Sequence, residues 1–182
     1  SRLESIGMII PSDDKRINSL LEIVKEREFQ GYSYDGAGAS FEILAKNILD
    51  AVPTFFSVEN FEVTISGKKD EHSLSKAKIS LNVDNRIINS VGEGNGPVNA
   101  LDNALRKDLG IYNEYIQDLV LLDYKVRILD GGTEAITRVV IESSDSNNQS
   151  WFTVGISTNI IEASFEALMD SINYKLLKSG IK

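Results

Sequence analysis

The sequence contains no cysteine, one histidine and only three prolines among its 182 residues. The absence of cysteine excludes disulfides, thiolate metal sites and a cysteine nucleophile. It is also usual for a cytosolic protein, so we expect a cytoplasmic location. Few prolines and an apolar content of 42% are typical of a folded globular chain. No apolar run approaches the roughly 20 residues needed to cross a bilayer, so the sequence predicts no membrane segment.

Positive charge is also scarce, because 27 acidic residues outweigh 19 basic ones and leave a net charge of −8. A nucleic-acid-binding protein needs a basic face to neutralise phosphates, and anionic membranes repel an acidic chain. We therefore expect neither nucleic acid nor a membrane as a partner. Binding of double-stranded RNA, which uses strand triplets with helices in other proteins, is the formal alternative that this charge disfavours.

Groups that could carry out catalysis are equally sparse. The single histidine, His72, lies in a polar stretch at 69–73 and is predicted to be a solvated loop residue. The segment 145–148 lacks the glycine and the final glutamate of a calcium-binding loop, so it is predicted to be a hairpin turn. The sequence therefore predicts no catalytic residue and no metal site in this chain.

The first fifty residues have helical spacing of their apolar side chains. One helix is predicted to begin at the caps offered by residues 12–14 and to end at Gly31. The glycines at 36 and 38 then interrupt the chain. Ser40 is predicted to cap a second helix that ends at Pro53. Residues 1–53 thus form a predicted helical subdomain.

From about residue 55 the apolar period changes to two, which predicts half-buried antiparallel strands. The first series consists of strands near 61–66, 76–83 and 86–92, a helix after Pro97 and a short helix or turn at 111–118. The second series consists of strands near 122–128, 135–143 and 151–156 and a long helix at 159–177.

The two series repeat at an offset of 63 positions in their first and third strands and their helices, and the middle strands need a different offset. Val91-Gly92 corresponds to Val154-Gly155, and Ala100 corresponds to Ala163. Phe61 corresponds to Tyr124 in the first strands. The alternative is chance similarity between two amphipathic helices, each preceded by Val-Gly. The sequence therefore predicts an α+β fold: a helical subdomain at 1–53 and a domain at 54–182 made of two βββα units related by a pseudo-twofold.

The segment 92–98, with three glycines and Pro97, joins a strand to a helix. Glycines permit positive φ and close backbone approach, and a helix N-terminus attracts anions such as a carboxylate or phosphate. A purely structural turn is the other interpretation, and no Lys-Ser/Thr pair follows as it would in a P-loop. The second series has Ser157-Thr158-Asn159 at this point, which is typical of an ordinary helix cap.

Several motifs in order resemble the allosteric region of the 2-isopropylmalate synthase family, and most closely its citramalate synthase branch. They are Gly92-Glu93-Gly94-Asn95-Gly96-Pro97-Val98-Asn99-Ala100, Leu122-Asp123-Tyr124-Lys125-Val126-Arg127-Ile128-Leu129-Asp130, Val140-Ile141-Glu142-Ser143, Trp151-Phe152-Thr153-Val154-Gly155 and Asn159-Ile160-Ile161-Glu162-Ala163-Ser164. The helical part agrees through Glu26-Arg27-Glu28-Phe29-Gln30-Gly31-Tyr32 and Asp35-Gly36-Ala37-Gly38-Ala39-Ser40-Phe41-Glu42. One departure is Gly38, where relatives often carry an acidic residue.

The resemblance implies a C-terminal regulatory piece of a longer acyltransferase, in keeping with a chain that begins with Ser1 rather than Met. The parent enzyme would condense acetyl-CoA with a 2-oxo acid, which is pyruvate in the citramalate synthase branch of isoleucine biosynthesis. Its catalytic TIM barrel, with a divalent metal, would lie outside this chain, and no cofactor is expected here. The regulatory domain would be a homodimer that binds a feedback inhibitor.

By position in the motifs, the resemblance also implies effector-binding residues. Gly94 and Gly96 would border the polar end of the ligand. Leu121, Tyr124 and Ile128 would line the pocket for its side chain, and Val139 is a looser assignment. This fits the chemistry of a zwitterion, which needs N–H groups for its carboxylate and an apolar cleft for its branched chain.

The leading hypothesis is therefore an isoleucine-sensing regulatory domain that inhibits its parent enzyme allosterically. A leucine-sensing domain of a 2-isopropylmalate synthase is one alternative. A second alternative is a module that mainly holds dimers together and positions the helical subdomain. A free-standing enzyme is the remaining, disfavoured alternative.

Overall fold

The computed structural model describes residues 2–50, 52, 54–129 and 135–181. Its contacts divide the chain into two compact units. Unit 1 comprises residues 1–53, 121–143 and 150–174, and unit 2 comprises residues 54–120, 144–149 and 175–182. The two-domain division of the sequence at 53/54 stays a prediction. The helix end expected at Ala51–Pro53, and Asp130 of the strand motif, lie outside the described residues.

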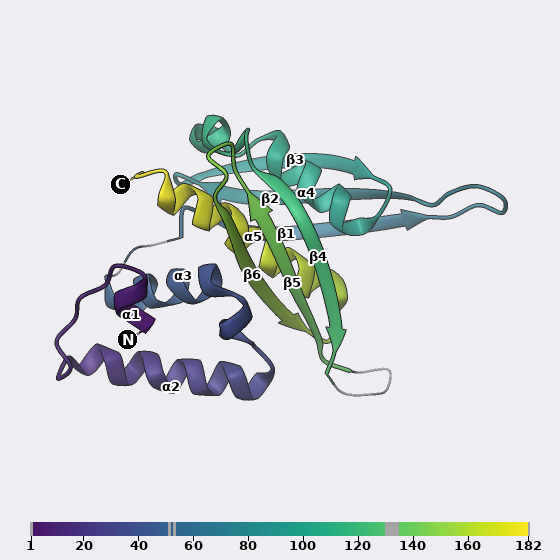
Figure 1. The fold of residues 1–182 in the computed structure, drawn as a ribbon. Coiled ribbons are helices and arrows are strands. Elements are labelled where there is room, and N and C mark those ends of the chain that lie inside the picture. The colour runs from purple at the N-terminus through teal and green to yellow at the C-terminus, as the bar shows by residue number, and fades with distance from the viewer. Residues whose placement is uncertain (1, 51, 53, 130–134, 182) are drawn as a thin grey trace. The chain divides into compact units, whose positions relative to one another are not determined.

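The elements follow the order that the apolar periods predict (Figure 1). The helices are α1 (Arg2–Ser5), α2 (Lys15–Gln30), η1 (Tyr34–Gly36), α3 (Gly38–Leu49), α4 (Pro97–Lys107), η2 (Gly110–Ile116) and α5 (Ile160–Lys178). The strands are β1 (Phe56–Ser66), β2 (Leu74–Val83), β3 (Arg86–Gly94), β4 (Val120–Ile128), β5 (Thr137–Ser144) and β6 (Ser150–Ser157). None of the helices in the described part of the chain is long and apolar enough to cross a membrane.

The predicted boundaries of α2 are confirmed. The Asp14 carboxylate accepts a hydrogen bond from the Arg16 N–H at 2.9 Å, and Gly31 ends the helix with a φ of 119°. The predicted cap of the next helix is wrong, because α3 begins at Gly38 and Ser40 lies inside it, buried. The Ser40 hydroxyl instead bonds to residues distant in sequence, as described below.

The apolar core of the helical part is built from α2, η1, α3 and one strand of unit 1. Leu20, Tyr34, Phe41 and Leu49 pack together in it, and each is at most 5% exposed. Val154 of β6 belongs to the same cluster and is fully buried. Thus the α2–α3 pair buries its apolar face on the sheet of unit 1, which is what an amphipathic helix requires.

The sheet of unit 2 has the strand order β1–β2–β3, with antiparallel pairing of both neighbours. Ile79 of β2 pairs with Phe61 of β1 and with Ser90 of β3. The alternate residues of β2 that face α4 are buried, as the period of two predicts; they are Ser75, Ala77, Ile79, Leu81 and Val83. The apolar face of α4 covers them with Ala100, Leu101, Ala104 and Leu105.

The sheet of unit 1 has the order β4–β5–β6, and the three strands run antiparallel (Figure 1). The odd-numbered residues of β5 face α5: Val139 and Ile141 are fully buried, and the Ser143 hydroxyl bonds to that of Ser171 at 2.6 Å. Trp151 of β6 is buried, and its Nε1 donates to the Ser171 hydroxyl at 3.3 Å.

The predicted repeat is confirmed inside the two βββα units. The Ser90 hydroxyl donates to the Ala104 carbonyl of α4 at 2.7 Å. The Thr153 hydroxyl donates to the Ala167 carbonyl of α5 at 2.8 Å. The two donors are 63 positions apart, and so are the two acceptors. Each βββα unit therefore joins its third strand to its helix by an equivalent hydrogen bond.

A glycine beside each of these hydroxyls allows the helix to lie close to the strand. A Cβ on Gly92 would come within 2.5 Å of the Ala100 carbonyl oxygen, and one on Gly155 within 1.8 Å of the Ala163 carbonyl oxygen. Neither glycine has a positive φ. Of the two properties that glycine permits, Gly92 therefore uses close approach and not a positive φ, and its close neighbour is the helix backbone.

Candidate effector site

The edge strand β4 carries an exposed apolar strip that we call the β4 strip: Leu122, Val126 and Ile128, which are 53%, 40% and 65% exposed. Tyr124 lies between them on the same strand face and is partly buried. Its hydroxyl makes a hydrogen bond of 2.6 Å with that of Ser164 in α5. A ring held at its far end against a helix, within an apolar strip open to solvent, could form one wall of a binding site or interface.

The structure places the predicted strand residues in different settings. Tyr124 and Ile128 are four positions apart and share a face of β4. Leu121 is three positions from Tyr124, so its side chain points to the other face of a regular strand. Val139 is fully buried in the sheet of unit 1. Of these four residues, only Tyr124 and Ile128 therefore share a surface that a ligand could contact. The assignment of all four to the effector pocket stays a prediction.

The two predicted glycines lie in unit 2, at the entry to α4. A Cβ on Gly94 would meet the Asn99 side-chain oxygen at 2.2 Å and the Ala100 nitrogen at 2.8 Å, so this position admits only glycine. Gly96 is the N-cap, and no side chain caps the helix there. A Cβ on Gly96 would meet nothing within 4 Å. The first turn of α4 thus begins in open space with N–H groups that no cap side chain satisfies.

The corresponding entry of α5 is different. Asn159 accepts hydrogen bonds with its side chain from the N–H of Ile161 at 2.9 Å and of Glu162 at 3.4 Å. The Ser157 hydroxyl accepts a bond from the Asn159 N–H. This confirms the ordinary cap predicted for the second series. The two helix N-termini therefore differ: a side chain caps the N–H groups of α5, whereas no side chain caps those of α4, which could attract a carboxylate.

On another side of α5, two acids reach the helical part of unit 1. The Tyr32 hydroxyl donates to Glu166, and the Ser40 hydroxyl donates to Asp170 at 2.7 Å. Ser40 also accepts a hydrogen bond from the Val154 N–H of β6 at 3.0 Å. One serine therefore connects α3, α5 and β6. These contacts leave no local signal in the sequence, because their partners are more than 100 positions apart.

Burial controls the ionisation of this acid pair. Burial raises the pKa of Asp170 to about 7, opposed by the Ser40 hydrogen bond and reinforced by the charge of Glu166. Burial also raises the pKa of Glu166, although the Tyr32 and Ile156 hydrogen bonds lower it. Arg27, whose guanidinium lies 5.5 Å from the centre of the Tyr32 ring, is the nearby cation that stabilises both carboxylates. The contact between α5 and the helical part is therefore sensitive to charge.

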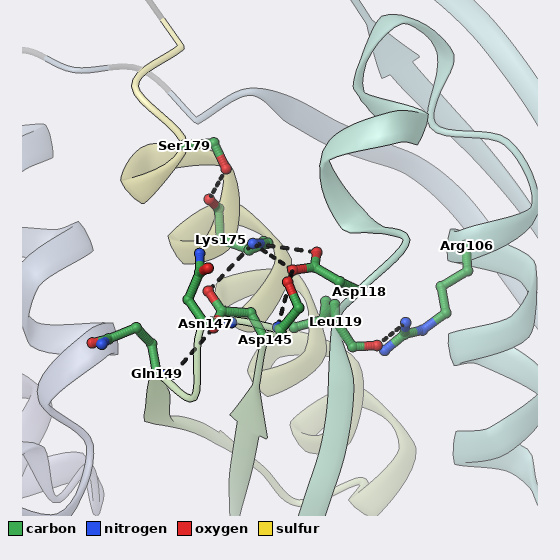
Figure 2. A network of polar contacts seen from close by, with 9 residues as sticks. Arg106, Asp118, Leu119, Asp145, Asn147, Gln149, Lys175 and Ser179 are labelled. Atoms are coloured by element: carbon green, nitrogen blue, oxygen red, sulfur yellow. Dashed lines mark hydrogen bonds and ion pairs between the residues drawn. The ribbon is translucent and has the colours of Figure 1, made fainter.

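A second polar network, in unit 2, anchors the end of α5 (Figure 2). The Lys175 ammonium lies 3.3 Å from carboxylate oxygens of both Asp118 and Asp145. The Asp118 carboxylate also accepts bonds from the hydroxyl and the N–H of Ser146, which lower its pKa to about 2. Lys175 is only 8% exposed. A buried ammonium that is paired with two carboxylates is a structural anchor for the end of α5.

The comparison with known families agrees with these features. The LeuA allosteric (dimerisation) domain family matches residues 36–176. The (R)-citramalate synthase of Geobacter sulfurreducens is 45% identical, and the match covers 98% of this chain and 34% of the relative. The (R)-citramalate synthase of Streptomyces coelicolor is 39% identical, again over 98% of this chain and 34% of the relative.

A 2-isopropylmalate synthase of Ruminiclostridium cellulolyticum is 32% identical, over 71% of this chain and 23% of the relative. The chain thus spans about a third of the length of the citramalate synthases that it matches. The two citramalate synthases match this chain at higher identity and over more of its length than the 2-isopropylmalate synthase does. The chain therefore belongs to the LeuA allosteric (dimerisation) domain family, on the citramalate synthase side of it.

Proposed function

We propose that this chain is the feedback-regulatory part of a citramalate synthase, that it forms a homodimer and that it binds isoleucine. The observation that carries the proposal is the match to citramalate synthases over 98% of the chain, combined with an apolar strip on β4 that is open to solvent. The parent enzyme would join acetyl-CoA to pyruvate in a catalytic part outside this chain, in the cytoplasm. The chain itself would carry out no catalytic step.

The β4 strip supplies what the side chain of a branched amino acid needs. Leu122, Val126 and Ile128 offer exposed apolar surface, and the Tyr124 ring is held among them by its bond to Ser164. The resemblance assigns Gly94 and Gly96 to the polar end of the ligand. The uncapped first turn of α4 is chemically suited to that task, because its free N–H groups and the helix dipole favour a carboxylate.

Helix α5 offers a physical route for regulation. It contacts β4 through Ser164 and the helical part through Glu166 and Asp170, all within unit 1. A ligand that binds Tyr124 better in one position of α5 would favour the helical contacts of that position. Such a bias is a coupling free energy, and it would work in both directions.

Calorimetric titration of the chain with isoleucine, leucine and valine tests the proposal. We expect heat and a rise in melting temperature with isoleucine, and weaker binding of leucine by roughly 10- to 200-fold, the range for one misplaced methyl group in an apolar pocket. Tyr124→Ala should abolish binding. The matched control is Tyr115→Ala, because Tyr115 is an exposed tyrosine of η2 in unit 2. If none of the three amino acids gives heat or a melting shift at millimolar concentration, the sensing function is refuted.

Two alternatives lead to different results. A leucine-sensing domain would bind leucine more tightly than isoleucine in the same titration. A pure assembly module would bind neither and would still sediment as a dimer, which the exposed β4 strip supports as a self-association surface. In the parent enzyme, removal of residues 54–182 distinguishes the two functions. Loss of feedback with the dimer retained supports sensing, and loss of the dimer supports assembly.

A further inference from the structure

Unit 1 contains a hollow on the face of its sheet that points away from α5. It has a volume of about 570 Å³ and is lined by Gly36, Lys125, Arg127, Arg138, Val140 and Phe152 in addition to the β4 backbone around residue 126. Arg138 and Val140 alternate along β5 with Val139 and Ile141, whose side chains are buried under α5. The hollow, which we call the basic hollow, is therefore separated from Tyr124 by the thickness of the sheet.

Three cations line this hollow in a chain whose net charge is −8. The Arg138 Nε donates to the Gly31 carbonyl at 2.8 Å, which fixes the position of its guanidinium. Burial, and then the positive charge of Arg127, lower the pKa of Arg138. The two guanidinium groups are thus close enough to repel each other.

Negative partners for this arginine pair are scarce. The described parts of β4 and β5 carry two carboxylates, Asp123 and Glu142. Asp123 lies 3.5 Å from Lys125, and no ion pair joins either acid to an arginine in the part of the chain that the structure describes. Among the described residues of these two strands, the arginine pair therefore has no ion-paired carboxylate, and a bound anion would offset the repulsion between the two guanidinium groups.

The rest of the lining is apolar. Val140 forms part of it, and Phe152 of β6 exposes 41% of its surface there. An exposed aromatic ring in a hollow that is also lined by guanidinium groups offers a surface on which planar rings stack. Arginine forks match the oxygens of a phosphate in pairs of parallel hydrogen bonds.

We propose that the basic hollow binds a phosphorylated molecule with a planar ring, that is, a nucleotide, with the phosphates on Arg127 and Arg138 and the base on Phe152. Its volume lies within the range of small-ligand pockets, about 300–1,000 Å³. An amino acid is a poor candidate, since its ammonium group would face three cations. This proposal does not depend on the effector-binding proposal, and the two sites lie on opposite faces of the sheet.

Titration of the chain with ADP, adenosine and inorganic phosphate tests the proposal. We expect ADP to bind more tightly than phosphate or adenosine, and its affinity to fall with added salt because part of the attraction is electrostatic. Arg127→Gln should weaken ADP by about tenfold or more, as expected when a charged hydrogen-bonding partner is lost. Phe152→Ala should weaken ADP and leave the affinity for phosphate unchanged.

Matched control variants distinguish the loss of a contact with ADP from damage to the fold. Lys78→Gln removes an exposed cation from β2 in unit 2, and Phe29→Ala removes an aromatic ring that is 93% exposed at the end of α2. Both should bind ADP as the unaltered chain does. Arg127 makes no contact like the Arg138–Gly31 bond in the described residues, so Arg127→Gln should keep the melting temperature. Absence of ADP binding at millimolar concentration, or equal affinities for ADP and phosphate, would overturn the nucleotide assignment.

Discussion

Replacement of Asp170 by asparagine tests the charge-sensitive contact between α5 and the helical part. Asp170 is partly buried, and burial raises its pKa from the ordinary 3.8 to about 7. Each unit of difference between folded and unfolded pKa corresponds to about 1.4 kcal/mol, so the full difference corresponds to roughly 4 kcal/mol. Remaining solvent contact of the side chain makes this an upper bound.

The sign of the effect follows from proton binding. Between pH 4 and pH 7 the folded chain holds a proton on Asp170 that the unfolded chain has released, so Asp170 lowers stability progressively as the pH rises through this window. At pH 8 the folded chain carries a largely desolvated carboxylate that accepts a hydrogen bond from the Ser40 hydroxyl at 2.7 Å. Asparagine has no charge and can still accept that bond with its amide oxygen.

We therefore expect Asp170→Asn to be more stable than the unaltered chain at pH 8, by up to about 4 kcal/mol, with the difference falling to no more than about 1 kcal/mol near pH 4.5. Urea unfolding followed by circular dichroism at both pH values measures the difference. Asp13→Asn, in the exposed turn before α2, is the control and should change nothing at either pH. A stability difference between the Asp170 variant and the unaltered chain that stays constant from pH 4.5 to 8 would refute the burial argument. The charges of Glu166 and Arg27 also act on Asp170, in opposite directions. Both residues are present in the variant and in the unaltered chain, so their own titration largely cancels in the comparison of the two proteins.

Three further changes test other contacts. Gly155→Ala should destabilise the chain by at least about 2 kcal/mol in urea unfolding, because its methyl group would overlap the helix backbone, whereas Gly96→Ala, in open space, should be within about 0.5 kcal/mol of the unaltered chain. Lys175→Met should lower the free energy of unfolding by about 2–3 kcal/mol, because Asp145 loses its cation in a setting where it is only 10% exposed; an unchanged urea midpoint would show that the anchor contributes nothing. Ser164→Ala should leave the fold intact and weaken isoleucine binding, since it frees the Tyr124 hydroxyl; unaltered affinity by calorimetry would show that this bond does not position the ring.

The sequence pattern correctly predicted the features that depend on interactions between residues close together in the chain. The alternation along β2 predicts a half-buried strand, and Asp14 and Gly31 predict the ends of α2, because pleat geometry and helix capping act over a few residues. The offset of 63 between Gly92 and Gly155 predicts the repeat for a similar reason, since each glycine serves the helix that directly follows its own strand.

Local pattern was misleading where a side chain serves a distant partner. Ser40 has the residue type of a helix cap and stands after two glycines, but its hydroxyl is used by Asp170 and by Val154. A sequence read along the chain has no signal for a bond that spans 130 positions. The complete burial of Val139 in the sheet of unit 1 also comes from tertiary packing, and its place in the effector pocket stays a prediction.

The sequence by itself determined the α+β class, the repeated strand–strand–strand–helix unit and the family, because each of these depends on periodicity or on short ordered motifs. Tertiary structure alone decided which groups meet: Tyr124 with Ser164, Tyr32 with Glu166, and Arg127 with Arg138 in one hollow. The physical reason is that burial and charge depend on distances in space. Arg127 and Arg138 are eleven positions apart in the sequence, and they can act together on a ligand only because the sheet places both on the same face.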